Sequence, residues 1–570
     1  MILQALKEYY DRKPDLPRAG FEMKEIPYVL VLNADGIPVN LTDTYEGMGK
    51  ERQAKKFLVP QSVKRTVDIS ANLLWDNPEY ALGIVCKGKP ARVANQHLAF
   101  RKRLDDLKLP HDPALLAVQK FLANPEKSTL LEAFGDRLEE MRKTGAFLSF
   151  RIVGQIGLIL EQPAIREAIT KTLSTRRESI CMVTGERDET EQVHAAIKGV
   201  WGAQKSGANI VSFNLDAFRS FNKKQGANAP VGKTAAFSYT TALNHLLDKT
   251  SKQRIQVGDA STVFWSQKAD PMEELMPSFF NEPPKDDPDR NVRAVEALFK
   301  AVRTGAYSSD DSNTRFYTLG LAPNASRISI RFWIVDTIAG MAEKICRHFE
   351  DTKVVHGPRD KDTLSLFRLL VSTAALGEAK NIAPNLGGDM MRSVLEGLPY
   401  PQTLLQAAVR RARIEREMTY PRAAIIKACL NRAFRFNNPT HKEELKVSLD
   451  TANPNIGYRL GRLFAALEKI QSEAVPGINA TIRDRFYGAA SSTPVTVFGN
   501  LMRLKNHHLS KLENVGRRIY FDKLLGEIVS EIVDFPAHLC MADQGRFAIG
   551  YYHQMQDFYS KKNHNPEKED

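Results

Sequence analysis

The stretch GYRLGRLFAALEKIQ, residues 457–471, decides the fold of the C-terminal third of the chain. An α-helix turns by about 100° per residue, which places the apolar side chains of this stretch on one side and three cations on an adjoining stripe. The apolar residues are Leu460, Leu463, Phe464, Leu467 and Ile470, and the cations are Arg459, Arg462 and Lys469. The stretch therefore predicts an amphipathic helix with positive charge beside its buried face.

The helical period extends on both sides of this stretch, from about residue 400 to the C-terminus. Asn, Pro and Gly, which are typical of helix ends, interrupt it at 437–439, 453–454, 476–477 and 494. Residues 400–570 hold 25 Lys and Arg against 18 Asp and Glu. We therefore predict a basic, all-α helical bundle in this region.

The first 280 residues have a mixed pattern, in which short β-rich runs alternate with helical pieces. The runs lie at 26–39, 81–88, 147–154, 178–186 and 209–214. A charged, proline-rich stretch at 281–291 predicts an exposed loop, and a second hairpin is predicted at 316–335. The fold class is therefore α+β, with a mixed α/β region containing short antiparallel strands at 1–280. A connecting α/β region follows at 281–399, before the helical bundle.

The charge balance indicates a polyanionic partner. The 570-residue chain has 80 Lys and Arg against 67 Asp and Glu, a net charge of +13. Such a basic surface most often binds a polyanion such as nucleic acid, the alternative being an anionic membrane. No apolar run approaches the roughly 20 residues that a membrane span needs. The N-terminus lacks the pattern of a signal peptide. The five cysteines lie far apart in the sequence, which suits reduced thiols in a reducing compartment. We expect a cytoplasmic protein.

Motifs of catalytic, metal and cofactor sites are not found. The nearest is GANAPVGKT at 226–234, but five residues separate its glycines where a phosphate-binding loop has four. We interpret it as a turn in which Thr234 caps the next helix. Cys181 and His194 lack two further ligands of a zinc site, and we expect a buried thiol and a surface imidazole. We therefore expect no catalytic residues, no cofactor and no metal; the alternative is a stand-alone metal-dependent nuclease whose acids converge from distant positions.

Two further helices of the bundle carry cations. After Pro494, Arg503, His507 and Lys511 align at positions i, i+4 and i+8. Another helix crowds cations at 410–416. Together with Arg459, Arg462 and Lys469, the aligned residues predict phosphate contacts along a nucleic-acid strand. The alternative is a set of solvated charged faces.

The stretch GVWGAQKSGANIVSFNLDAFRSFNKKQGANAPVGK, residues 199–233, is rich in Gly, Asn, Gln and Lys. Glycine lets the backbone approach a ligand closely, and amide side chains both donate and accept hydrogen bonds. Such side chains, together with Lys, read base edges and contact neighbouring phosphates. The stretch therefore predicts a binding loop, the alternative being an irregular connection.

Several stretches resemble the large subunit of the type I-C CRISPR interference complex, Cascade. In chain order between Asn72 and Gln554 they are NLLWDNPEYALG, AFLSFRIVG, CMVTGE with HAAIKGVWGAQ, GANIVSFNLDAF, QGANAP with AAFSYTTALNHLL, GYRLGRLFAALEKIQ, RFYGAASSTPVTVFGNLMRL and QGRFAIGYYHQ. The resemblance implies a non-catalytic subunit that reads the short motif (PAM) flanking the target on double-stranded DNA. It also implies roles in strand separation, R-loop stabilisation and recruitment of a helicase-nuclease.

The partners that the resemblance implies are guide RNA, target double-stranded DNA, the other Cascade subunits and the helicase-nuclease. The C-terminal bundle resembles the Cascade small subunit, which can be translated separately from within the large-subunit gene. A basic scaffold for guide RNA alone is a further alternative, and it predicts no preference among flanking motifs.

Within residues 220–226, two positions depart from the family pattern. Asn222 stands where the resemblance leads us to expect glycine, and Lys224 stands where we expect glutamate, whereas Lys223, Gln225, Gly226 and Asn228 match. We predict that Gln225 and Asn228 approach base edges in the minor groove and that Lys223 contacts the adjacent phosphate. Asn72 is predicted to assist from the N-terminal region.

Overall fold

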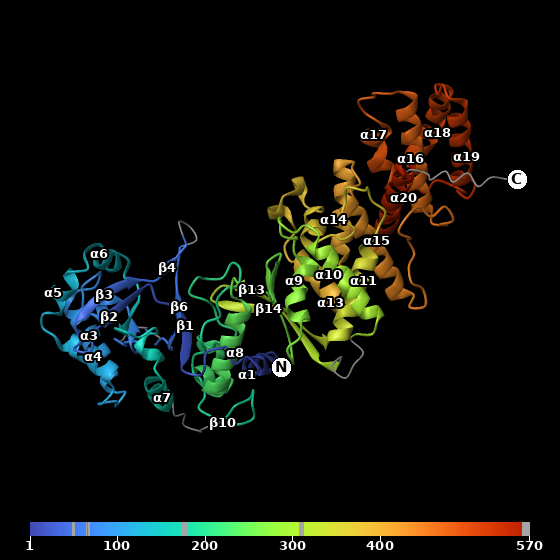
Figure 1. Ribbon diagram of the computed structural model, residues 1–570. Coiled ribbons are helices and arrows are strands. Elements are labelled where there is room, and N and C mark those ends of the chain that lie inside the picture. The colour runs from blue at the N-terminus through green and yellow to red at the C-terminus, as the bar shows by residue number, and fades with distance from the viewer. Residues whose placement is uncertain (48–51, 64, 66–68, 173–178, 307–312, 561–570) are drawn as a thin grey trace. The chain divides into compact units, whose positions relative to one another are not determined.

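The computed structural model describes residues 1–47, 52–63, 65, 69–172, 179–306 and 313–560 (Figure 1). The chain divides into two compact units. Unit 1 comprises Met1–Ala195 and Val211–Leu243, and unit 2 comprises Ala196–Ile210 and Asn244–Asp570. The predicted boundaries at 280 and 399 both fall inside unit 2.

Unit 1 contains a four-stranded sheet in the order β3-β2-β8-β7. The central strand β2 (Tyr28–Leu32) pairs antiparallel with β3 (Pro38–Asp43) and parallel with β8 (Leu148–Ile152). The edge strand β7 (Trp75–Asp76) pairs antiparallel with β8. The hairpin predicted at 26–39 is therefore confirmed. Its turn requires glycine, since Gly36 has a φ of +82° and a Cβ there would lie 2.6 Å from a backbone oxygen of α4 (Pro113–Ala123).

The other elements of unit 1 are short strand pairs and helices. The pairs are β1 (Phe21–Glu25) with β6 (Lys56–Pro60), β4 (Tyr45–Glu46) with β5 (Gln53–Ala54), and β9 (Ser179–Ile180) with β10 (Arg187–Asp188). The helices are α1 (Ile2–Asp11), α2 (Pro78–Ala81), α3 (Pro90–Asp105), α4, α5 (Lys127–Glu132), α6 (Gly135–Thr144), α7 (Pro163–Thr172) and the start of α8 (Lys233–Leu246). Four of them begin with proline, which fits the first helical position because its N–H is not needed there.

Two of the predicted β-rich runs do not form strands. At 81–88 the backbone instead binds a side chain: Glu79 Oε1 accepts hydrogen bonds from the N–H groups of Cys86, Lys87 and Gly88 at 3.3, 2.8 and 2.7 Å. At 209–214, the pairing is reduced to a single bridge between Asn209 and Arg327. At 81–88, strand propensity is overridden because the backbone N–H groups find a side-chain acceptor nearby.

Unit 2 contains an antiparallel sheet in the order β11-β12-β13-β14. Its strands are β11 (Arg254–Val257), β12 (Ala260–Ser266), β13 (Arg315–Asn324) and β14 (Arg327–Thr337), and the last two form the hairpin predicted at 316–335. Phe264, Phe316 and Ile334 belong to a core shared with helices. Figure 1 shows α9 (Met272–Phe280), α11 (Ile338–Thr352) and α13 (Leu386–Glu396) beside this hairpin.

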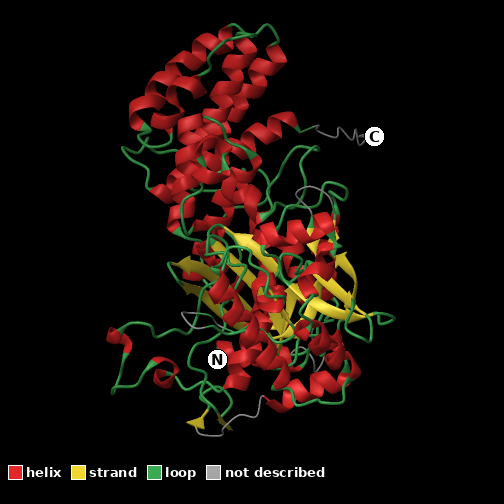
Figure 2. Cartoon of the chain, turned by 90° about the vertical axis from the view of Figure 1, so that its left-hand side faces the viewer, coloured by secondary structure: helices red, strands yellow, loops and turns green. Residues whose placement is uncertain are grey.

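In the region from Gln402 to Tyr559, every described secondary-structure element is a helix (Figure 2), which together with the preceding sheets confirms the α+β class. Its helices are α14 (Gln402–Glu415), α15 (Tyr420–Asn437), α16 (Ile456–Ala474), α17 (Ile482–Ala490), α18 (Val495–Ser510), α19 (Val515–Val529) and α20 (Met541–Tyr559); α10 (Arg290–Arg303) and α12 (Leu366–Val371) precede them. Helices α16 and α20 cross closely. A Cβ on Gly461 would lie 2.0 Å from the Phe547 carbonyl oxygen. None of the described helices combines the length and apolarity that a membrane crossing requires.

The predicted bundle does not have one separate core. Helices α16 to α20 enclose a core of their own, but α14, α15 and one face of α20 belong to the core that contains the sheet. Helix α20 contributes Phe547 and Tyr551 to the first core and Ile549 and Tyr552 to the second. The C-terminal helices are thus continuous with the rest of unit 2.

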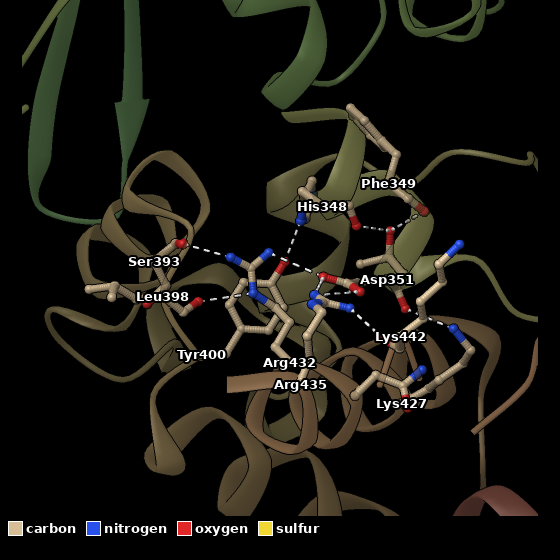
Figure 3. Close-up of polar contacts among 12 residues, drawn as sticks. His348, Phe349, Asp351, Ser393, Leu398, Tyr400, Lys427, Arg432, Arg435 and Lys442 are labelled. Atoms are coloured by element: carbon tan, nitrogen blue, oxygen red, sulfur yellow. Dashed lines mark hydrogen bonds and ion pairs between the residues drawn. The ribbon is translucent and has the colours of Figure 1, made fainter. Parts of the chain in front are cut away.

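A buried polar network fixes α11 against α15 (Figure 3). The Asp351 carboxylate accepts hydrogen bonds from Arg432 at 3.3 Å and from Arg435 at 2.8 and 3.0 Å, and Lys427 donates to the Asp351 carbonyl oxygen at 3.1 Å. Nearby, His348 bonds to the Tyr400 hydroxyl, and burial lowers the pKa of His348 to about 3. Breaking such a buried ion pair would leave a charge without compensation in the core.

Candidate nucleic-acid interface

Three predicted contact residues lie together in unit 1, in residues 219–230, which we call the amide loop. It follows the 3₁₀ turn η3 (Asp216–Phe218) and contains the turn η4 (Gln225–Asn228). The Asn228 side-chain oxygen accepts from the Ser220 N–H at 3.0 Å, and its Nδ2 donates to the carbonyl oxygens of Lys223 and Gln225 at 3.1 and 3.0 Å. Asn228 therefore closes the loop from within.

The base of the amide loop is held by a close backbone approach. The Gly226 N–H donates to the Gln192 carbonyl oxygen at 3.1 Å. A Cβ on Gly226 would lie 2.0 Å from the Glu191 carbonyl oxygen, so this position accepts only glycine. An isolated bridge between Thr190 and Gly232 fixes the chain that leaves the loop. Contacts with residues 190–192 thus set the second half of the loop and the chain that leaves it.

The tip of the amide loop points its polar groups outward. Lys223, Lys224 and Gln225 are exposed, and none of the three side chains bonds to another of the described residues. Asn222 has a φ of +58°, a left-handed conformation that asparagine tolerates better than most residues other than glycine. The replacement of the expected glycine by Asn222 therefore preserves the turn. Lys224, in place of the expected glutamate, adds positive charge to the tip.

The segment 226–234 is not shaped for a phosphate. A Cβ on Gly232 would lie 2.5 Å from the carboxylate of Asp188, which accepts a hydrogen bond from the Thr234 N–H at 3.0 Å. The side chain that accepts a hydrogen bond from the first turn of α8 is thus that of Asp188 and not, as predicted, that of Thr234. A carboxylate at a helix N-terminus takes the place that an anion would use.

Asn72 is buried, with 3% of its surface exposed. Its side-chain oxygen accepts a hydrogen bond from the Val63 N–H at 3.0 Å, and its own N–H donates to the buried Asp76 carboxylate at 2.8 Å. Asn72 therefore orders the chain that leads into β7. This placement speaks against a direct contact with DNA.

On α16, two of the three cations of the predicted stripe are buried. Arg459 is 3% exposed and pairs with Glu531. Arg462 is fully buried and donates to Gln554 Oε1 at 3.1 Å and to a Glu527 carboxylate oxygen at 2.9 Å. The acceptors come from α19, α20 and the segment between them, which cover α16 on the side that the helical period leaves for solvent.

Lys469, the third cation of that stripe, is partly exposed. Its ammonium lies 3.5 Å from the Glu473 carboxylate and 5.0 Å from the centre of the Tyr559 ring. These contacts satisfy its charge in part, so Lys469 is a weaker candidate for a phosphate contact than a cation without an acid beside it.

The predicted stripe on α18 is exposed. Arg503, His507 and Lys511, the last at the C-cap, all face solvent, while Phe498 and Leu501 enter the core. Helix α18 contains no acidic residue, and Arg503 and Lys511 form no ion pair with another described residue. Burial, followed by the charges of His507 and Lys511, lowers the pKa of His508. The helix thus presents a cationic face.

Two of the four arginines at 410–416, Arg410 and Arg413, line a groove between α14 and α17. Its volume is about 530 Å³, and its walls include Gln406, Val409, Arg410, Arg413 and Gly488. Arg413 donates to Gln544 Oε1 at 3.2 Å, whereas Arg410 is exposed. The sequence singled out the arginines, but the groove depends on α17, which no local pattern connects with them.

Comparison with known proteins gives a family for the chain. A family model described as CRISPR-associated protein (Cas_Csd1) matches residues 6–559. The chain belongs to this family. No curated protein matches it.

Membership of the Cas_Csd1 family means that the protein is CRISPR-associated and works with nucleic acid and other Cas proteins. An exposed cationic helix and a loop bearing amides and lysines suit such a setting. Within the described residues, no three His, Cys, Asp or Glu side chains are grouped so that they could hold a metal ion. His194, expected at the surface, is buried, and its Nδ1 lies 2.6 Å from the Tyr239 hydroxyl.

Proposed function

We propose that the chain is the non-catalytic large subunit of a type I-C CRISPR RNA-guided surveillance complex and that it recognises the PAM on target double-stranded DNA. In RNA-guided systems the guide reads the target by base pairing, and the protein reads only the short flanking motif. The subunit then aids strand separation, stabilises the R-loop and helps recruit the helicase-nuclease. Its partners are guide RNA, target DNA and the other Cascade subunits.

The observation that carries this proposal is the construction of the amide loop. Asn228 uses its oxygen and its Nδ2 within the loop, so it positions the loop rather than reading bases. The exposed amide of Gln225 both donates and accepts, as reading a base edge requires. Lys223, two residues away, supplies the phosphate contact. A narrow loop of this kind fits the minor groove, which is too narrow for a helix.

The cationic face of α18 serves a second part of the proposed function. Phosphate contacts supply affinity without sequence information. We assign such contacts to Arg503, His507 and Lys511, which hold a DNA strand, and a minor contact to Lys469. Arg459 and Arg462 are left out because their guanidinium groups are buried in ion pairs.

The test measures binding of the chain, assembled with guide RNA and the backbone subunits, to duplexes with a randomised flanking motif. Gln225→Ala is expected to flatten the preference between motifs, at a cost of about 1–3 kcal/mol on the preferred one. Lys223→Ala is expected to weaken binding to all duplexes equally and to lower the salt slope by about one. Lys143→Ala, at an exposed lysine of α6, is the matched control. Unchanged motif preference in Gln225→Ala would show that the reader lies elsewhere.

The two alternatives predict other results. A stand-alone nuclease would cut DNA when the pure chain is incubated with magnesium, and no observation favours it. A scaffold for guide RNA alone would bind RNA without preferring duplex DNA that carries one particular flanking motif.

A further inference from the structure

One aromatic side chain of the amide loop has no role within the fold. Phe221 is 94% exposed. Apolar side chains stabilise a fold when folding removes them from water, but the Phe221 ring remains almost entirely in contact with water. Its removal would therefore not weaken a core.

The backbone holds this ring outward in a conformation that phenylalanine disfavours. Phe221 has a φ of +53° and precedes Asn222 at +58°. Asparagine visits this left-handed region, but a bulky side chain there is an outlier. The bonds from Asn228 to the Ser220 N–H and the Lys223 carbonyl oxygen lie on either side of this pair and keep it in place. For the turn alone, glycine would suffice at 221.

The surroundings of Phe221 are cationic. Lys223 and Lys224 are exposed and form no ion pair with another described residue, and Arg219 lies 2.7 Å from Asp216. An exposed ring beside free cations suits a ligand that is both anionic and flat. Unpaired nucleic acid has these properties: its phosphates attract the lysines, and every base offers a face on which a ring can stack.

We propose that Phe221 stacks on an unpaired nucleobase at the point where the duplex held by the amide loop opens. The inference rests on the proposed function, in that the amide loop must face nucleic acid, and it adds a contact that is independent of base identity. Gln225 and Lys223 engage the paired region, and Phe221 covers the first base beyond it.

The experiment uses the full-length chain and a forked DNA that carries 2-aminopurine as the first unpaired base. Stacking quenches this fluorophore, and anisotropy of a distant label gives the affinity. Phe221→Ala and Phe221→Leu are expected to lose the quenching and to bind the fork about tenfold more weakly. Phe221→Trp is expected to retain both, and binding to a fully paired duplex is expected to stay the same in all three variants.

Two controls separate stacking from misfolding and from a general loss of apolar surface. The unfolding temperature of each variant should equal that of the wild type, because the ring is exposed. Phe367→Ala removes a ring of α12 that is 45% exposed and should leave fork binding unchanged. Wild-type binding and quenching in Phe221→Leu would overturn the inference, since leucine keeps an apolar group but cannot stack.

The source of the base is tested by single-stranded RNA of the same sequence. An equal loss with RNA would show that stacking does not depend on the sugar, whereas a loss confined to RNA, with the fork bound and quenched as by the wild type, would overturn the inference. If Lys223→Ala weakens DNA binding while Phe221→Ala binds and quenches like the wild type, the stacking inference fails alone. If Lys223→Ala, Gln225→Ala and Phe221→Ala all bind like the wild type, the amide loop does not face nucleic acid, and both proposals fail.

Discussion

The side chain of Asn228 satisfies one backbone N–H and two backbone carbonyl groups of the amide loop. Such local bonds from an asparagine side chain compete with regular secondary structure and stabilise turns. Asn228 therefore shapes the loop, whereas its neighbours Gln225 and Lys223 present the polar groups that face outward.

Asn228→Ala is therefore expected to loosen the amide loop and to remove motif preference along with it. Hydrogen exchange in residues 219–230 should become faster, because the Ser220 N–H loses its acceptor and the turn loses the bonds to the carbonyl oxygens of Lys223 and Gln225 that close it. Asn222→Gly is the matched control: glycine adopts the same positive φ, so exchange and motif preference should both be retained. Wild-type exchange in Asn228→Ala would contradict this account of the loop.

His348 predicts a pH dependence of stability. Burial lowers its pKa to about 3 in the folded chain, against about 6.5 in an unfolded one. As the pH falls below about 6.5, the unfolded chain binds a proton that folded His348 does not. The free energy of unfolding should therefore fall by about 1.4 kcal/mol per pH unit from this residue, between roughly pH 6 and 4.

Denaturant unfolding of His348→Gln between pH 4 and 6 checks this prediction. Glutamine can keep a hydrogen bond with Tyr400 but does not titrate, so the slope of stability against pH should decrease by about one proton. An unchanged slope in His348→Gln would show that His348 is protonated in the folded chain.

At the scale of elements, α16 and α18 have similar sequence patterns but different environments. Both carry cations at helical spacing. The cations Arg459 and Arg462 of α16 pair with acids brought in by the chain at 527–531, whereas Arg503 and Lys511 meet none among the described residues. The first pattern therefore stabilises the fold, and the second remains available to a ligand.

Substitutions on the two helices should have opposite effects. Arg462→Ala is expected to cost about 3 kcal/mol of stability, because it removes a fully buried side chain and leaves the buried Gln554 Oε1 without its donor. The double variant Arg503→Glu with Lys511→Glu should unfold like the wild type, bind DNA more weakly with a salt slope lower by about two, and keep its motif preference. Thermal unfolding and salt titrations measure these effects, with Lys143→Glu and Lys249→Glu together as the control. A changed motif preference would show that α18 contacts bases.

The C-terminal helices also allow a prediction about a fragment that begins at residue 448. Because α16 to α20 share a core, circular dichroism should show a folded helical fragment. The face of α20 with Ile549 and Tyr552 would lose its cover from α14 and α15. The fragment should therefore bind a hydrophobic dye and melt at a lower temperature than residues 400–570. Equal melting temperatures would contradict the shared core.

For the whole molecule, the two units have separate hydrophobic cores. We expect calorimetry to show two unfolding transitions. Asp351→Ala should lower the temperature of only one transition, that of unit 2, and should reduce the free energy of unfolding of that unit by about 3 kcal/mol. The reason is that Arg432 and Arg435 lose their carboxylate partner. Asp287→Ala, at a partly exposed acid paired with Arg293, is the control. A shift of both transitions would show that the units unfold together.

Local pattern was sufficient for much of the fold. Helical periodicity predicted α16 and α18, turn residues predicted the hairpins β2–β3 and β13–β14, and the β-rich run at 147–154 became β8. These elements follow from neighbours in sequence, because side-chain period and turn preference are local properties. The run at 81–88 failed because Glu79 captured its backbone donors. The resemblance to CRISPR-associated proteins likewise came from the sequence and is confirmed by the family match.

The sequence by itself thus determined the α+β class, the basic character of the chain and the amide loop as a candidate site. Only the tertiary structure decided which polar side chains are available to a ligand. Arg459 and Arg462 are buried against segments that their own sequence neighbourhood does not reveal, and Asn72 is buried as well, while Phe221 is left exposed. The physical reason is that periodicity shows which residues share a face, whereas covering that face depends on contacts between residues far apart in the chain.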